Sequence, residues 1–402
     1  MSPLPGGDGR VSAMPHVSLV SERLGEIQLA MRERKLEGWL LSDHRGQNRI
    51  ALRALGLGPE TGRMPPLRRL FYWLPSDGMP VVIAHALEID TVPELPGEQL
   101  SYASWAELRR ALERTLPTRG TVAMEHATIA ASPEVARVEA GTVGLVESYG
   151  SKVVSSIDLA NAFVGTLRDA EISALRRTVS SLADVRSALV AELRAGFTPE
   201  DVARAATTRI EAAGLVVVEP PMVAAGAATR SWPREHSKRP VGEREHVLVD
   251  LFAREGAGPC AHLGVVLSRG ESKIAERMLR ETARLRDAAV AIVQTRLGKG
   301  ERLLGYEVDE VAQLEAARRE RSAGIRHRTG SHVGTVPFSG EACTFDGLEI
   351  SDTRAALAGH AWSVHPGLYD ESFGMRAHAV LLATARGCEV LDRGQDAPLV
   401  IG

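Results

Sequence analysis

The segments VLVDLFAR (247–254) and CAHLGVVL (260–267) form the strongest structural signal in this chain. Both are apolar and rich in β-branched residues, and they flank a loop, Glu255–Pro259, with two glycines and a proline. Apolar runs separated by such a loop are typical of a β-hairpin. The sequence therefore predicts two adjacent strands in the core of a sheet.

A carboxylate and an imidazole lie within these two predicted strands. If the strands pair around Gly256, Asp250 lies opposite His262, and both side chains point to one face. Burying both groups is costly unless each has a polar partner. The two residues therefore belong to a metal site or form a hydrogen-bonded acid–base pair. In the simplest case, this hydrogen-bonded Asp–His pair has only a structural role.

Composition sets the class of protein. The chain has 402 residues, enough for two or three domains. Its 44% apolar and 25% charged residues are ordinary for a soluble globular protein. A net charge of −3 gives no electrostatic basis for binding nucleic acid or an anionic membrane. No apolar run reaches the roughly 18 residues that span a bilayer. We expect neither nucleic acid nor membrane among its partners.

The N-terminus and the cysteines indicate the compartment. Residues 1–16 are rich in Gly, Pro and Ser and lack the apolar core of a signal peptide, so we expect a disordered tail. The cysteines, Cys260, Cys343 and Cys388, are widely spaced and odd in number. This argues against a disulfide framework and for a reducing compartment. We expect a cytoplasmic protein.

Two regions with different organisation follow. From 17 to about 160, strand and helix signals alternate, which predicts an α/β domain. From 165 to 402, the order of helix, helix and strands occurs twice, with long amphipathic helices at 167–195 and about 272–294. This predicts an α+β domain built from two similar halves.

Five of the twelve histidines lie beside strand or turn signals between residues 262 and 378: His262, His327, His332, His365 and His378. We expect His365 at the end of a strand at 362–365 and His378 within a strand at 375–382. Imidazoles on neighbouring strands near a carboxylate suit a divalent transition metal. A single such histidine is more often a satisfied core or surface residue, and this spacing is not itself a metal motif.

Further segments carry a family resemblance: EISALRR (171–177), HRTG (327–330), DGLE (346–349), DTR (352–354), PGLY (366–369) and FGMR (373–376). Together with 247–251, they resemble the pita-bread family of Xaa-Pro dipeptidases, aminopeptidase P and creatinase, over about 17 to 401. The resemblance implies an α/β creatinase-like N-terminal domain at 17–160 and an α+β, pseudo-duplicated pita-bread domain at 165–402. It also implies a homodimer, because family members often complete the site with a partner residue.

The chain departs from the family at the metal ligands. The resemblance implies two divalent ions held by Asp, Asp, His, Glu and Glu. The matching positions here read Asp250, His262, Ser331 (with His332 next to it), His365 and His378. The family set carries about four negative charges, whereas this set carries about one when its imidazoles are neutral. Without bridging carboxylates, the geometry of a two-metal site is lost.

Replacement of ligands by histidine favours a rebuilt site over a decayed one. We predict one divalent transition metal, Fe, Zn, Mn, Co or Cu, held by Asp250, His262, His365 and His378, with His332 as an optional fifth ligand. The predicted function is that of a mononuclear metalloenzyme acting on a small, polar, amino-acid-like molecule. Hydrolytic and oxidative chemistry both stay open.

Two alternatives remain at this point. The first is a metal-independent, creatinase-like C–N hydrolase with His236 as the base, since Pro233 occupies the family's substrate-side histidine position. The second is a non-catalytic binding module on a peptidase scaffold. The catalytic candidates are His236 and His332. The candidates for substrate binding are Arg230, Arg234, His327, Tyr369 and Arg376.

Overall fold

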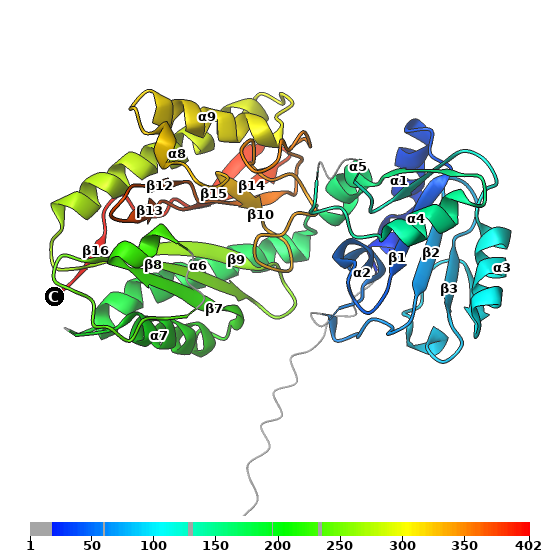
Figure 1. Ribbon diagram of the computed structural model, residues 1–402, viewed down its shortest axis with the longest axis horizontal. Coiled ribbons are helices and arrows are strands. Elements are labelled where there is room, and N and C mark those ends of the chain that lie inside the picture. Colours follow the sequence, from blue (N-terminus) through cyan, green and yellow to red (C-terminus); the bar gives the residue numbers. More distant parts are fainter. Residues whose placement is uncertain (1–17, 59–60, 128–131, 195, 232–234) are drawn as a thin grey trace, which may run out of the picture. The chain divides into compact units, whose positions relative to one another are not determined.

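The computed structural model of the chain describes residues 18–58, 61–127, 132–194, 196–231 and 235–402 (Figure 1). The predicted tail at 1–16 lies outside these residues. The chain forms two compact units, one made of residues up to His126 with Arg137–Ser156, the other of Ala127–Ala136 with Ile157–Gly402. In the part of the chain described, no helix is both long and apolar enough to cross a membrane.

The first unit is an α/β fold around a six-stranded sheet of order β4-β3-β2-β1-β5-β6. Its strands are β1 (Gly38–Asp43), β2 (Leu70–Pro75), β3 (Val81–His85), β4 (Glu98–Tyr102), β5 (Thr121–Met124) and β6 (Lys152–Ser155). Its helices are α1 (Leu19–Glu33), α2 (Arg49–Leu55), the short η2 (Ile89–Thr91), α3 (Trp105–Thr115) and α4 (Ala140–Glu147). The alternation of strands and helices confirms the predicted fold class.

The second unit contains two helix–helix–strand segments. The first has α6 (Asp169–Glu192), α7 (Pro199–Ala212), β7 (Val216–Ala225), β8 (His246–Arg254) and β9 (Ala261–Arg269). The second has α8 (Lys273–Gly298), α9 (Gly305–Ala317), β10 (Gly330–His332), β11 (Ala361–Val364), β12 (Gly367–Tyr369), β13 (Gly374–Arg376), β14 (Ala379–Thr384), β15 (Gly387–Asp392) and β16 (Leu399–Ile401). Short helices lie at α5 (Ile157–Leu159), η4 (Ala160–Val164), η5 (Gly226–Arg230) and η6 (Ser322–Gly324). The predicted duplicated architecture is confirmed.

Three sheets make up this unit, of order β16-β9-β8-β7, β10-β11-β14-β15 and β12-β13. In Figure 1, α6 and α7 lie on one side of these sheets, and α8 and α9 lie on the other. Helix α7 begins with a capping box between Thr198 and Asp201 and with Pro199 in its first turn.

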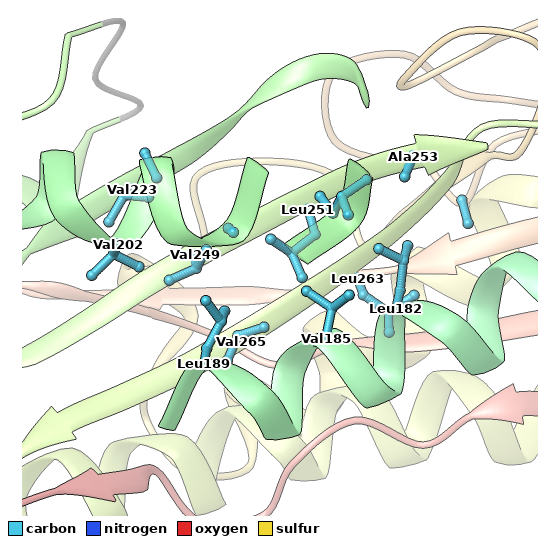
Figure 2. Packing of buried hydrophobic residues seen from close by; sticks show 14 of the residues in the cluster. Leu182, Val185, Leu189, Val202, Val223, Val249, Leu251, Ala253, Leu263 and Val265 are labelled. Atoms are coloured by element: carbon cyan, nitrogen blue, oxygen red, sulfur yellow. The ribbon is translucent and has the colours of Figure 1, made fainter. Parts of the chain in front are cut away.

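The β8–β9 hairpin has one face in the core and the other toward the predicted site. Val249 and Leu251 of β8 and Leu263 of β9 belong to a buried cluster with α6 (Figure 2). Because side chains alternate along a strand, Asp250 and His262 lie on the opposite face. The core therefore fixes which residues face the site.

The register of the hairpin differs from the predicted one. Asp250 pairs with Gly264, and His262 pairs with Phe252. The prediction that Asp250 lies directly opposite His262 is therefore wrong by two residues. A shift of two leaves every side chain on its own face, so Asp250 and His262 still share one face as diagonal neighbours.

The predicted strand at 375–382 is two strands in different sheets. Val364 pairs with Ala379 in the β11–β14 ladder, and Gly367 pairs with Arg376 in the β12–β13 ladder. His365 and His378 lie in the interruption between the two ladders. Pro366, which has no N–H to donate, is part of this interruption. The break places both imidazoles at the junction of two sheets.

Candidate metal centre

Three side chains form a compact buried group: Asp250 on β8, His262 on β9 and His378 after β13. One potential ligand atom of each lies within 4.8 Å of the other two. Asp250 Oδ1 is 3.0 Å from His262 Nε2 and 3.3 Å from His378 Nε2. In a tetrahedral site with bonds of about 2.1 Å, neighbouring ligand atoms are about 3.4 Å apart. The two measured spacings are therefore compatible with ligands of one ion.

A glycine makes room for this group. Gly264 lies opposite Asp250 in the hairpin. A Cβ atom at Gly264 would lie 1.8 Å from Cδ2 of His378, far inside any allowed contact. The lack of a side chain on β9 at this position thus lets the imidazole of His378 reach the carboxylate of Asp250.

Asp250 is held as a carboxylate by a buried cation. Its Oδ2 accepts a hydrogen bond of 2.5 Å from the Arg376 guanidinium. Burial alone would raise the pKa of Asp250, but the charge of Arg376 and the rings of His262 and His378 outweigh burial and hold the pKa well below its usual range. Arg376 occupies Oδ2 and leaves Oδ1 directed at the two imidazoles.

His262 is oriented from both sides. Its Nδ1 is 2.9 Å from Ser363 Oγ, and its ring stacks on Phe252 with centroids 4.5 Å apart. Ser363, His262, Asp250 and Arg376 thus form a continuous buried chain of hydrogen bonds. This chain is complete without an ion, so it agrees with both readings of the Asp–His pair that the sequence left open.

His378 and His365 each carry a ring nitrogen without a hydrogen-bond partner. Among the described residues, Nδ1 of His378 and Nδ1 of His365 make no hydrogen bond, and Nε2 of His378 faces the carboxylate of Asp250 at 3.3 Å. Burial lowers the pKa of His378 to about 4, and burial with the neighbouring imidazoles lowers the pKa of His365 well below its usual value. Buried neutral imidazoles with free lone pairs are the donors that transition metals prefer.

His365 lies beside the three-residue group. Its ring centroid is 5.6 Å from that of His262 and 6.0 Å from that of His378. Its Nε2 is 3.1 Å from Ser331 Oγ. The predicted ligand is therefore next to the centre, between the compact group and the cleft described below.

His332 is not brought to this group. Its Nε2 is 2.9 Å from the carbonyl oxygen of Gly165, and its ring lies near His360. Adjacent residues of a strand point to opposite faces, so Ser331 faces His365 and His332 faces away. This removes the basis for the predicted roles of His332 as a fifth ligand and as a catalytic residue.

A cleft of about 810 Å³ lies beside the histidines. It is lined by Glu219, Pro220, Pro221, Met222, His236, His327, Arg328, Ser331, Phe338, Glu349 and His365. His236 Nε2 donates to the carbonyl oxygen of Pro221 at 2.8 Å, which leaves Nδ1 as the basic nitrogen of that ring. The predicted catalytic residue His236 therefore shares the cleft with His365.

The predicted substrate-binding residues divide into two groups. His327 lines the cleft, and its Nε2 is 2.9 Å from the hydroxyl of Tyr369. Burial lowers the pKa of His327 to about 4, so the ring is neutral near pH 7. Arg376 is engaged with Asp250, and Arg230 is exposed and not part of the cleft lining. Arg234, like Pro233, lies outside the described residues.

Comparison with known proteins identifies the family. Residues 173–385 match the model of metallopeptidase family M24, which is more than half of the chain. The chain belongs to family M24. Among curated protein sequences, none matches this chain.

Solved structures of several peptidases share the fold at low identity. Dipeptidase PepE from Mycobacterium ulcerans superposes with a TM-score of 0.77 at 18% identity, covering 95% of this chain and 98% of that one. A prolidase from Thermococcus sibiricus superposes with a TM-score of 0.72 at 15% identity, and the match covers 94% of this chain and 98% of that one. An X-Pro aminopeptidase from Thermotoga maritima superposes with a TM-score of 0.70 at 18% identity, and the match covers 95% of this chain and 99% of that one. These likenesses establish the pita-bread fold with its N-terminal domain.

The compact group in this M24 protein offers few negative charges to a metal ion. Asp250 is the one carboxylate in the compact group, and one of its oxygens is bound to Arg376. Two dications would need bridging carboxylates to offset their charge. One ion fits the group, because Asp250 Oδ1 and the imidazole nitrogens lie close together and His378 has no other partner.

Three residues that shape the site were not predicted. Gly264 provides space, Ser363 orients His262, and Phe338 contacts the rings of His262 and His365. A glycine inside a β-branched strand signals the close approach of another group, so Gly264 could have been identified. Ser363 and Phe338 depend on contacts between distant segments, for which the sequence offers no local signal.

We predict that Gly264→Ala destabilises the protein. The new methyl group would overlap the ring of His378, and overpacking of this kind costs about 1–3 kcal/mol of unfolding free energy. The matched control is Gly298→Ala, where no heavy atom lies within 4 Å of the added carbon. Urea unfolding measures both. Equal stability of the two variants would contradict the close approach of His378 to Gly264.

A second prediction concerns acid stability. Both nitrogens of buried His360 are used in the neutral form, since Nε2 donates to Asn161 O and Nδ1 accepts from Leu357 N. Burial lowers its pKa to about 3. The unfolded chain therefore takes up the proton first, and this stabilisation, full above about pH 6.5, is lost as the pH falls toward 3.

At pH 5 the loss from His360 amounts to about 2 kcal/mol. We expect His360→Gln to be less stable than the wild type at pH 7 and to lose about 2 kcal/mol less between pH 7 and pH 5. Urea unfolding at the two pH values gives the comparison, with exposed His44→Gln as the control. A variant that loses as much stability as the wild type would disprove the assignment.

Proposed function

We propose that this M24 protein is a single-metal enzyme acting on a small, polar, amino-acid-like molecule. The observation that carries the proposal is the compact group of Asp250, His262 and His378, in which Nδ1 of His378 makes no hydrogen bond among the described residues. The group adjoins a cleft of 810 Å³, because His365 and Phe338 both line the cleft and contact His262. This volume suits a small-molecule ligand.

Asp250, His262 and His378 would hold the ion, and His365 stands next to them. A bound transition metal would supply a Lewis acid and open positions for water, substrate or dioxygen. Arg376 keeps Asp250 ionised and fixes its orientation. Ser363 fixes the ring of His262, as outer partners of ligating histidines do. His236, with its Nε2 on Pro221, offers Nδ1 to accept a proton in the cleft.

The proposal also covers the oligomeric state of the protein and its location in the cell. We infer a homodimer from the resemblance to family members that complete their site with a partner residue. We infer a cytoplasmic location from the free cysteines, since Cys260 and Cys343 are buried thiols rather than disulfides.

Metal analysis tests the central proposal. We expect protein purified without a histidine tag to contain about one divalent transition-metal ion per chain. His378→Gln should lower the metal content at least about tenfold, because it removes a neutral imidazole donor. Elemental analysis by mass spectrometry gives the stoichiometry, and circular dichroism checks the fold. Exposed His44→Gln is the control and should keep its metal. Metal at background, or two ions per chain, would refute the proposal.

A metal-independent C–N hydrolase is the second candidate. It is favoured by the position of His236 in the cleft and by the chain from Arg376 to Ser363, which is satisfied without an ion. In this case, chelator-treated protein keeps its turnover of a guanidino or amide compound. A binding module would instead hold such compounds without turnover.

We predict that His236→Ala separates these cases. If His236 is the base, kcat falls by about 10²- to 10⁴-fold while the metal content stays unchanged. His236 is half-buried and far from the compact group in sequence, so the fold should persist. His85→Ala, in the other unit, is the control. Unchanged kcat in His236→Ala would remove His236 as the base in either mechanism.

A further inference from the structure

A second cavity, of about 410 Å³, lies in the unit that carries the candidate metal centre. Among the described residues, none lines both this cavity and the cleft. Four of its nine lining residues are arginine, whereas lysine and arginine together make up 48 of the 402 residues of the chain. We propose that this arginine-lined cavity binds a small molecule that carries two or more linked phosphate groups. The proposal does not depend on the proposed function.

Helix α8 contributes one face to the arginine-lined cavity. Ile274, Arg277, Met278, Glu281 and Arg284 belong to the lining, and residues three, four and seven apart share a face of a helix. Arg277 and Arg284 are exposed, and among the described residues neither has a hydrogen bond or an ion pair. The two residues are two helical turns, or about 10 Å, apart along the axis. Two unpaired guanidinium groups thus border the cavity from different turns of α8.

The other two arginines of the lining are held by neighbouring side chains. Arg319, which follows α9, donates from Nη2 to Glu315 Oε1 at 2.7 Å. Arg321 has its Nη2 2.8 Å from Met278 Sδ and its Nε 3.5 Å from Glu281 Oε2. A side chain that is already held loses little conformational freedom when a ligand binds. These two guanidinium groups are therefore partly preorganised for an anion.

The turn between β12 and β13 contributes the last two lining residues, Asp370 and Phe373. Oδ1 of Asp370 accepts hydrogen bonds from the backbone N–H groups of Ser372 and Phe373, at 2.7 and 2.9 Å. The ring of Phe373 lies against the buried ring of His246, with centroids 4.6 Å apart. The carboxylate of Asp370 is thus engaged by its own turn, and the turn is anchored to the β8 strand.

The charges of the lining favour a ligand with several negative charges. Four arginines face two carboxylates, Glu281 beside Arg321 and Asp370 in its turn. The whole chain carries a net charge of −3, so this excess of cations is a local feature. Guanidinium groups bind phosphate through paired N–H···O hydrogen bonds, and linked phosphates can engage several of them at once. The volume of the cavity lies within the range of small-molecule sites.

The test compares two anions that differ in the number of linked phosphates. Calorimetry on the full chain at low salt gives the Kd values of inorganic tripolyphosphate and inorganic phosphate. We expect tripolyphosphate to bind at least about tenfold more tightly. The double variant Arg277→Gln, Arg284→Gln should weaken its binding at least about tenfold, whereas lysine at both positions should retain part of the affinity. Arg280→Gln is the matched control, because Arg280 is exposed on α8, pairs with Glu276 and does not line the cavity.

Tripolyphosphate also chelates metal ions, so the titrations are repeated with chelator-treated wild type and with His378→Gln. Binding that persists in both and is lost in the arginine double variant supports the cavity as the site. Binding that the double variant retains, or that disappears with His378→Gln, would overturn the proposal. Equal Kd values for the two anions, or an equal loss in Arg280→Gln, would also overturn it, because general attraction to surface charge would then explain the binding. None of these outcomes bears on the metal content, so the two proposals can fail separately.

Discussion

The ion pair between Asp250 and Arg376 is the constraint on which the site depends. Both side chains are buried, and a buried charge is tolerated only when it is paired and hydrogen-bonded. Arg376 sits at the end of β13, directly before the break that contains His378. The pair therefore joins the β8–β9 hairpin to the second half of the unit. It also decides which oxygen of Asp250 stays available to the imidazoles.

Much of this arrangement could be predicted from the sequence, because strand alternation is robust to errors of register. The pairing of Asp250 with His262 was wrong by two residues, yet both side chains lie on the predicted face. A shift by two preserves the face, whereas a shift by one would reverse it. The apolar residues of the hairpin fix that face, since they pack on α6. The fold class followed from the same patterns.

The parts that could not be predicted depend on where ladders end. His378 was expected inside one long strand, but the chain changes sheet at Ala377, and His378 owes its position to that break. His332 was predicted as a ligand because it follows a family ligand position, Ser331. Successive side chains of a strand point to opposite faces, so His332 points away from the site. Space for His378 comes from Gly264, and the segment that carries Phe338 is held by a contact of Gly334 with distant Cys260 and a bridge between Ser339 and His332.

The chemistry of Ser363 reconciles the two readings of the centre. Without an ion, His262 Nε2–H donates to Asp250, and Nδ1 accepts from the Ser363 hydroxyl. If the group held an ion, Nε2 of His262 would offer its lone pair, and Nδ1 would carry the proton and donate it to the same hydroxyl. A hydroxyl rotates to give or to accept, so His262 can change tautomer without moving. His378 has no such hydroxyl partner: its Nε2 lies 3.3 Å from Asp250 Oδ1, and its Nδ1 makes no hydrogen bond among the described residues. The hydroxyl of Ser363 therefore makes the position of His262 compatible with both readings of the Asp–His pair.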